Sequence, residues 1–292
     1  MTAPSLSVVI AVQMAQQNLP EIIQRLGCER HPEVEFLACY SDADPEVPRL
    51  LANQRNIRAL PGLPGSLIPH LWRDGILAAR HGAVAITTAH CIPDENWVER
   101  LLDADLQGLG GIGGVIDNHP ESDAKGWAIF LLRYIAYAPP QAARRVEEIA
   151  ADNALYRRSD ILLQRDLLND GFWEPSFHAR FRAAGLPLAL EPRLRVVHRN
   201  RYGARQFFQQ RFAHGREFGL ARAAGLPLIK RAVLIVLSPV LPLIFLRKIV
   251  GAANAPPQYR RQLPRALPWL LFFLLGWGLG EARGYLESMV RK

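Results

Sequence analysis

Two uncharged, strongly apolar runs constrain this chain more than any other feature of its sequence. Residues 232–246 (AVLIVLSPVLPLIFL) and 266–280 (ALPWLLFFLLGWGLG) contain no charged side chain. A helix that crosses a bilayer needs about 20 apolar residues, so each run alone is marginal for a span. We expect a membrane to cover them, because little of the chain remains for a domain that would do so. Two buried core helices are the alternative.

The charge distribution supports the membrane prediction. The net charge of +8 divides into −5 for residues 1–198, with 19 basic and 24 acidic residues, and +13 for residues 199–292, with 16 and 3. Basic residues such as Lys230 and Arg247 flank the apolar runs. Anionic lipid head groups attract basic residues in such positions. Nucleic acid is not an expected partner, because the basic residues do not alternate with aromatic side chains along a groove.

The first two thirds of the chain alternate between short apolar runs and amphipathic stretches. The predicted strands are residues 7–12, 34–39, 57–60, 83–87, 108–115, 154–156 and 194–198. The predicted helices are residues 18–26, 67–80, 95–104, 159–163 and 177–184, with Gly82 and Gly185 as left-handed caps after two of them. Residues 127–137 are apolar and fit a helix or a strand. This alternation predicts an α/β fold with a mixed, mostly parallel sheet.

The change in composition predicts two parts. Residues 1–203 form the α/β domain, and residues 204–292 form a basic amphipathic helix followed by two apolar membrane-associated helices. Three scattered cysteines form no disulfide framework or zinc pattern, so a reducing cytosolic setting is expected for the α/β domain.

Motifs in a fixed order carry a family resemblance over nearly the whole chain. They are residues 7–12 (SVVIAV), 82–97 (GAVAITTAHCIPDENW), 152–158 (DNALYRR), 173–185 (WEPSFHARFRAAG) and 196–198 (VVH). Their order and spacing resemble those of family 2 glycosyltransferases. The resemblance implies the Rossmann-like GT-A fold of nucleotide-diphospho-sugar transferases.

The resemblance also implies a function. Members of this family are inverting transferases of the hexosyltransferase type that move a sugar from a nucleotide-sugar donor to an acceptor. For this chain the expected acceptor is membrane-proximal, either lipid-linked or a polysaccharide glycan. The expected location is the cytoplasmic face of the bacterial inner membrane, in cell envelope polysaccharide biosynthesis. A catalytically impaired, transferase-like binding or assembly protein at the membrane is the alternative.

Inverting transfer needs a general base and a means of stabilising the departing diphosphate. The resemblance assigns the base to Glu174, which lies between Trp173 and Pro175 just before a predicted helix. There it is partly desolvated, although a carboxylate that only complements the helix dipole fits the same position. His178 lies four residues later on the same helical face and is expected to tune Glu174 or contact the acceptor.

Further residues are expected to bind donor or acceptor. By the resemblance, these are Asp42, Thr88, Asp152, Asn153 and Trp173. Arg199 is expected to offset the charge of the diphosphate or, equally, to face lipid phosphates. Asp152 and Asn153 fit a turn equally well.

The chain departs from the family at its metal-binding motif. Where members have Asp-x-Asp, this chain has Thr88-Ala89-His90, so the first carboxylate is missing. His90 and His198 are the candidate ligands for Mn²⁺ or Mg²⁺, with a diphosphate supplying further oxygens. Two histidines without a carboxylate suit a hard ion poorly, so metal-independent activity is the alternative.

Overall fold

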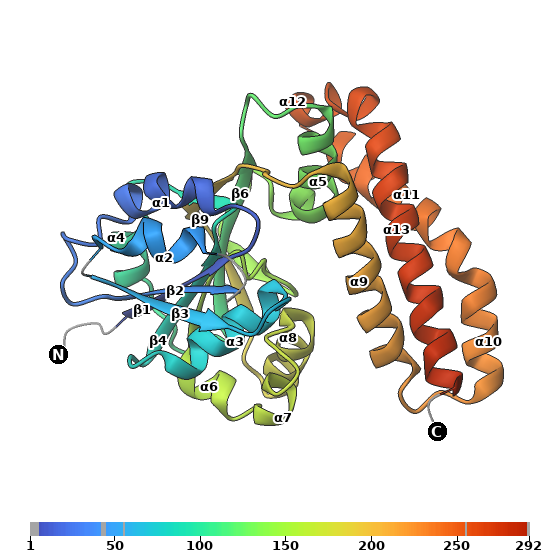
Figure 1. Ribbon diagram of the computed structural model, residues 1–292, viewed down its shortest axis with the longest axis horizontal. Coiled ribbons are helices and arrows are strands. Elements are labelled where there is room, and N and C mark those ends of the chain that lie inside the picture. The colour runs from blue at the N-terminus through green and yellow to red at the C-terminus, as the bar shows by residue number, and fades with distance from the viewer. Residues whose placement is uncertain (1–5, 42–44, 55, 255, 291–292) are drawn as a thin grey trace. The chain divides into compact units, whose positions relative to one another are not determined.

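The computed structural model describes residues 6–41, 45–54, 56–254 and 256–290. These residues form two compact units (Figure 1). The first unit comprises the chain up to His119 together with Tyr137–Arg201, and the second comprises Pro120–Ala136 and the chain from Tyr202 onward. The sequence pattern places residues 120–136 in the first domain, whereas in the structure they belong with the C-terminal helices.

The first unit contains a nine-stranded sheet in the order β3-β2-β1-β4-β8-β6-β9-β5, with β7 paired to β9. The strands are β1 Leu6–Val12, β2 Glu35–Ser41, β3 Ile57–Gly62, β4 Ala83–Thr88, β5 Cys91–Pro93, β6 Gly111–Asn118, β7 Arg144–Val146, β8 Asn153–Arg157 and β9 Leu188–His198. The predicted α/β class and the mixed sheet are confirmed.

The sheet is less parallel than predicted. Strands β3, β2, β1 and β4 form a continuous parallel block, in which Val9 of β1 pairs with Leu37 of β2 and Ile86 of β4. Every residue of β1 is buried, as expected for a central parallel strand covered on both faces. Strand β8 then pairs antiparallel with both β4 and β6, which ends the parallel block. Among the described residues, four of the eight strand pairs are parallel.

Short helices cover the sheet. They are α1 Leu19–Leu26, α2 Glu46–Leu51, α3 Ile68–Ala78, α4 Trp97–Leu102, α6 Arg158–Leu162, α7 Arg165–Leu168 and α8 Glu174–Ala183. Helix α3 packs so closely on β1 and β2 that a Cβ atom on Gly75 would overlap the side chains of Val9 and Cys39. Gly185 has a φ of +75° just after α8, as predicted, whereas Gly82 is not in the left-handed region. Helix α3 ends at Ala78, too early for Gly82 to cap it.

The second unit is helical. Its helices are α5 Ala124–Tyr134, α9 Ala204–Ala223, α10 Leu228–Leu237, α11 Leu241–Asn254, α12 Pro257–Arg260 and α13 Leu263–Val290, with a 3₁₀ turn at Ser238–Val240 between α10 and α11. The segments Leu228–Asn254 and Leu263–Val290 are long and apolar enough to cross a membrane, by length and composition alone. In the most apolar stretch of 18 residues, only 17% is buried in the first segment and 39% in the second.

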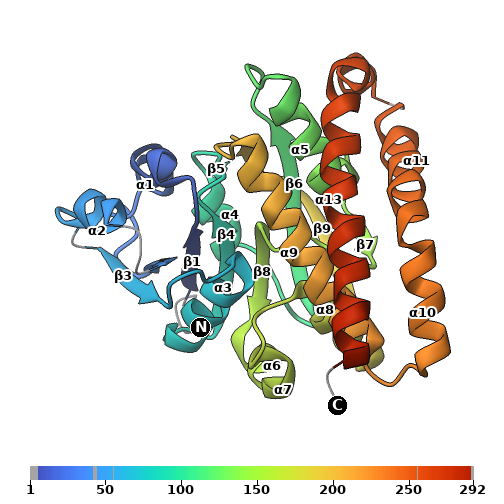
Figure 2. The same cartoon turned by 45° about the vertical axis from the view of Figure 1, so that its right-hand side comes forward.

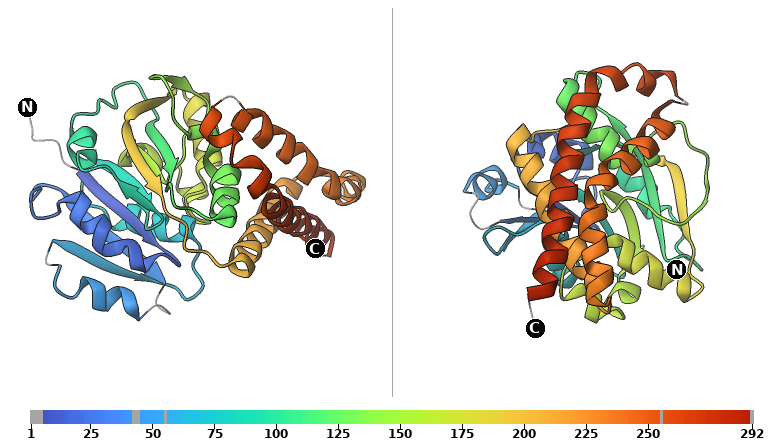
Figure 3. Two further views of the ribbon diagram at one scale, coloured as in Figure 1. Left: turned by 90° about the horizontal axis from the view of Figure 1, so that it is seen from above. Right: turned by 90° about the vertical axis from the view of Figure 1, so that its right-hand side faces the viewer.

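Helix α13 packs against α9, α10 and α11 (Figures 2 and 3). Glycines permit its close approach to α9. A Cβ atom on Gly280 would overlap the carbonyl oxygen of Phe212, and one on Gly215 would overlap that of Trp277. The two helices are therefore in backbone contact.

Candidate functional site

The predicted site residues gather where the parallel strands β1 and β4 end. Gln13 follows β1 directly, and its side-chain amide donates a hydrogen bond of 2.9 Å to the carbonyl of Ser66, just before α3. Thr88 is the last residue of β4. Ligands of open α/β sheets bind outside the carboxyl ends of the strands. We call this region, with Gln13, Thr88, His90 and Asp152, the carboxyl edge.

Thr88 and Asp152 are in direct contact at the carboxyl edge. The Thr88 hydroxyl donates a hydrogen bond of 3.2 Å to Oδ1 of Asp152, and the Thr87 hydroxyl donates one of 2.8 Å to the Asp152 main-chain carbonyl. Both Thr88 and Asp152 are buried. The structure thus brings together two residues, 64 positions apart in sequence, that were predicted to bind donor or acceptor.

His90 and His198 also come together. Strand β5 pairs with β9 so that Cys91 lies opposite His198, and the main-chain N–H of Arg199 donates to the His90 carbonyl at 2.7 Å. The centroids of the two imidazole rings are 6.2 Å apart, and both side chains are fully buried. His90 Nε2 lies 2.9 Å from the carbonyl oxygen of Gln13.

This pair does not fit the predicted Mn²⁺ or Mg²⁺ ion. Across the described parts of the chain, no group of three or more His, Cys, Asp or Glu side chains is placed to hold a metal. Two imidazoles without a carboxylate are a poor donor set for ions that prefer oxygen ligands.

Arg199, a predicted donor contact, is engaged by other side chains. Its guanidinium bonds to Glu21 at the start of α1, at 2.5 Å, and lies 3.2 Å from Nε2 of His119. The charge of Arg199 is therefore balanced within the protein. Asp42, the remaining carboxylate expected on this side of the sheet, lies outside the described residues.

Glu174, the predicted base, begins α8 and is half-buried. Two further carboxylates share its surroundings. Burial raises the pKa of the Tyr137 phenol, and the negative charges of Glu174, Glu148 and Asp152 raise it further. Three carboxylates from separate segments are therefore near enough for their charges to act on one phenol, and we call Glu174, Glu148 and Asp152 the acidic cluster. Since Asp152 also contacts Thr88, this acidic cluster adjoins the carboxyl edge.

His178 connects two members of this region. Burial raises the pKa of Tyr156 well above its ordinary value, and its hydroxyl forms a hydrogen bond of 2.9 Å with Nε2 of His178. The Nδ1–H of His178 then donates to Oε2 of Glu148 at 2.5 Å. The His178 ring is fully buried and stacks on Tyr156, with ring centroids 6.0 Å apart. His178 thus faces Glu148 and Tyr156.

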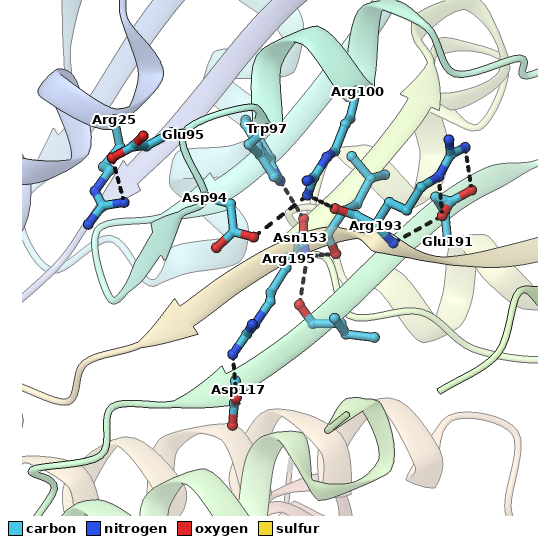
Figure 4. A network of polar contacts seen from close by, with 12 residues as sticks. Arg25, Asp94, Glu95, Trp97, Arg100, Asp117, Asn153, Glu191, Arg193 and Arg195 are labelled. Carbon is cyan, nitrogen blue, oxygen red and sulfur yellow. Dashed lines mark hydrogen bonds and ion pairs between the residues drawn. The ribbon is translucent and has the colours of Figure 1, made fainter. Parts of the chain in front are cut away.

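Asn153 is occupied by structural hydrogen bonds, as Figure 4 shows. Its side-chain NH₂ donates to the carbonyls of Val115 and Leu194, each at 3.0 Å, and its oxygen accepts from Nε1 of Trp97 at 2.8 Å. These bonds lie where the β6–β9 ladder is interrupted between Gly113 and Val115. Both N–H groups and the oxygen of this amide are used within the fold, so we leave Asn153 out of the proposed sugar site.

Trp173 remains next to the predicted base. Its indole N–H donates to the Asp170 carbonyl at 2.9 Å, and its ring lies edge-on to His70 with centroids 6.4 Å apart. These contacts fix the ring at the start of α8. Trp173 is half-buried, which suits a side chain that packs against a bound ligand.

The sequence patterns did not point to Glu148 or Tyr137. Tyr137 ends a 3₁₀ turn after α5 and Glu148 lies between β7 and β8, both outside the motifs that carry the resemblance. The run Glu147-Glu148 is the one local signal for a carboxylate there, and it is typical of an exposed turn. Only the folded structure places these residues beside Glu174.

A cavity of about 610 Å³ lies elsewhere in the first unit. Its lining includes Leu6 and Ala83, which begin β1 and β4, together with Arg80, His81 and Arg158. The cavity is therefore at the amino ends of these strands, and we call it the amino-edge cavity. None of the predicted site residues lines it.

Comparison with known proteins gives no match: no protein-family model and no curated protein is detectably similar to this chain.

Proposed function

We propose that this protein is a membrane-associated, inverting glycosyltransferase of the GT-A type, which uses a nucleotide-sugar donor and a lipid-linked or polysaccharide acceptor. The observation that carries the proposal is the contact between Thr88 and Asp152 at the end of β4. Glu174 begins α8, and its charge, with those of Glu148 and Asp152, raises the pKa of Tyr137. The resemblance of the sequence to family 2 glycosyltransferases is a separate reason to propose Glu174 as the general base.

In the proposed reaction, the Glu174 carboxylate takes the proton of an acceptor hydroxyl. The acceptor oxygen attacks the anomeric carbon of the donor sugar, and the bond from that carbon to the diphosphate breaks. The nucleoside diphosphate leaves with the bonding electron pair, and the configuration at the anomeric carbon inverts. A positioned base of this kind contributes about 10²- to 10⁴-fold to the rate.

Asp152 is proposed to recognise the donor sugar. An ionised carboxylate has about four lone-pair positions, so Asp152 can accept from a sugar hydroxyl as well as from Thr88. Trp173 is proposed to pack against the sugar or acceptor. Glu148 and His178 are proposed to hold the buried side of the cluster in place through their hydrogen bond.

The missing Asp-x-Asp carboxylate favours a second candidate, a transferase-like binding or assembly protein without turnover. In that protein the cluster binds a glycan and no base is needed. The two candidates differ in whether a nucleotide sugar binds and is consumed.

Calorimetric titration of the purified full chain with nucleoside-diphosphate sugars, with and without Mn²⁺, tests the donor site. We expect binding, and we expect Asp152→Asn to weaken it about tenfold or more, because a hydrogen bond to a charged group is worth about 1.5–3 kcal/mol. The control is Asp103→Asn, which changes an exposed aspartate outside the site. Absence of donor binding in every metal condition would contradict the transferase proposal.

A further inference from the structure

The helices of the second unit are packed so that each fixes the depth at which its neighbour can lie in a membrane. The carbonyl oxygens of Phe212 and Arg216 lie against Gly280 and Gly284. Sequence numbers increase together along α9 and α13, so the two helices run parallel and in contact at the same level. Where the two helices are in contact, any depth that α13 takes in a membrane is therefore also the depth of α9.

Helix α9 carries charged groups at this level. The Arg211 guanidinium carbon lies 5.7 Å from the ring centroid of Trp277, and the Arg222 guanidinium lies 3.6 Å from the Glu281 carboxylate. Arg216 pairs with Glu287 at 2.5 Å. Charged side chains of α9 thus lie beside the C-terminal half of α13. The start of α9 adds the exposed side chains of Arg205, Gln206 and Gln209.

The α10–α11 segment runs in the opposite direction. Arg231 donates to the carbonyl of Ser288, whereas Ser238 lies against Gly278. The uncharged stretch between Arg231 and Arg247 holds 15 residues, or about 22 Å of helix. The hydrocarbon core of a bilayer is about 30 Å thick. The charge-free part of this bundle is therefore too short to cross it.

The same segment nevertheless exposes a continuous apolar stripe. Its members recur every three or four residues on one side of α10 and α11: Leu228, Ile229, Val233, Val236, Leu237, Val240, Leu243 and Ile244. The other side, with Ser238, Pro242 and Ile249, is buried. Lys230 at one end and Arg247 and Lys248 at the other place positive charge beside the stripe. An apolar face between basic ends matches a bilayer surface with anionic head groups.

We infer that the second unit lies within one leaflet and does not cross the bilayer. The apolar stripe of α10–α11 contacts acyl chains, the basic ends contact head groups, and the charged residues of α9 stay at the level of the head groups and water. This inference rests on the membrane association in the proposed function and adds its topology.

Cysteine labelling tests the topology. Ala224→Cys lies in the exposed turn before α10, and Gln258→Cys lies in α12, beyond the other end of α11. The natural cysteines Cys28, Cys39 and Cys91 are buried and give a low background. Each variant is added to preformed vesicles of phosphatidylcholine and phosphatidylglycerol, recovered by flotation and treated with a membrane-impermeant maleimide. Gln107→Cys, at an exposed position in the first unit, serves as the reference.

If the unit lies in one leaflet, both variants react to the same extent as Gln107→Cys without detergent. If α10–α11 crosses the bilayer, one variant reacts only after detergent is added, and the inference is wrong. Failure to float with the vesicles, including assembly into a soluble oligomer that covers the stripe, also overturns it. The donor titration is made without vesicles, so failure of the transferase proposal is a separate result.

Discussion

Replacing Glu174 with glutamine is expected to lower glycosyl transfer by about 10²- to 10⁴-fold while leaving donor affinity nearly unchanged. Glutamine keeps the size and hydrogen-bonding ability of the side chain but cannot take a proton from the acceptor. The measurement is release of nucleoside diphosphate from the donor that binds in calorimetry, with a membrane lipid extract as the source of acceptor.

The matched control is Glu147→Gln, which makes the same chemical change at an exposed position 27 residues earlier. Its turnover is expected to stay at the wild-type level. Turnover of Glu174→Gln that equals the control would show that another group is the base.

Glu174→Gln also has a readout that does not depend on activity. Because the charge of Glu174 raises the pKa of Tyr137, its removal stabilises the phenolate and lowers that pKa. Glu174 also raises the pKa of Tyr156, so a spectrophotometric tyrosine titration of the variant is expected to show the phenols of Tyr137 and Tyr156 ionising at lower pH than in the wild type. An unchanged titration would show that Glu174 does not lie beside Tyr137.

The largest expected effect on stability comes from Asn153→Leu. The substitution removes three hydrogen bonds and leaves the carbonyls of Val115 and Leu194 and the indole N–H of Trp97 without this partner in the core. Each unsatisfied buried group costs about 1–3 kcal/mol. We expect the free energy of unfolding to fall by about 4 kcal/mol, measured by urea denaturation followed by far-ultraviolet circular dichroism.

Asn96→Leu is the control, because Asn96 is exposed and its side chain makes no capping hydrogen bond to α4. Its effect is expected within about 0.5 kcal/mol. A loss for Asn153→Leu as small as that of the control would mean that the junction of β6, β8 and β9 does not depend on this side chain. Such a result would return Asn153 to the candidate ligand-binding residues.

Local sequence patterns were sufficient to predict those elements that depend on interactions between neighbouring residues. The β-branched run at residues 7–12 predicted β1, and the position of Glu174 before an amphipathic stretch predicted a carboxylate at the start of a helix. The order of strands β8 and β6 was not predictable in this way, because antiparallel pairing of β8 depends on contacts between distant segments.

Long-range contacts also explain the two main differences from the sequence prediction. Residues 120–136 belong to the second unit, where Trp127 and Phe130 of α5 pack around Tyr259, more than 120 residues later. Tyr137 ends a 3₁₀ turn after α5 and Glu148 follows β7, and no periodicity in either segment relates these residues to Glu174. Conversely, Asn153 lies in a family-like motif, yet its hydrogen bonds are used within the fold.

We propose that the carboxyl edge, with Thr88 and Asp152, is the donor site. A structure of the full chain with a nucleoside diphosphate bound would test this proposal. We expect the diphosphate at the carboxyl edge, on the side of the sheet where β1 and β4 end, within reach of Thr88. A diphosphate bound instead in the amino-edge cavity, against Arg80 and Arg158, would contradict it.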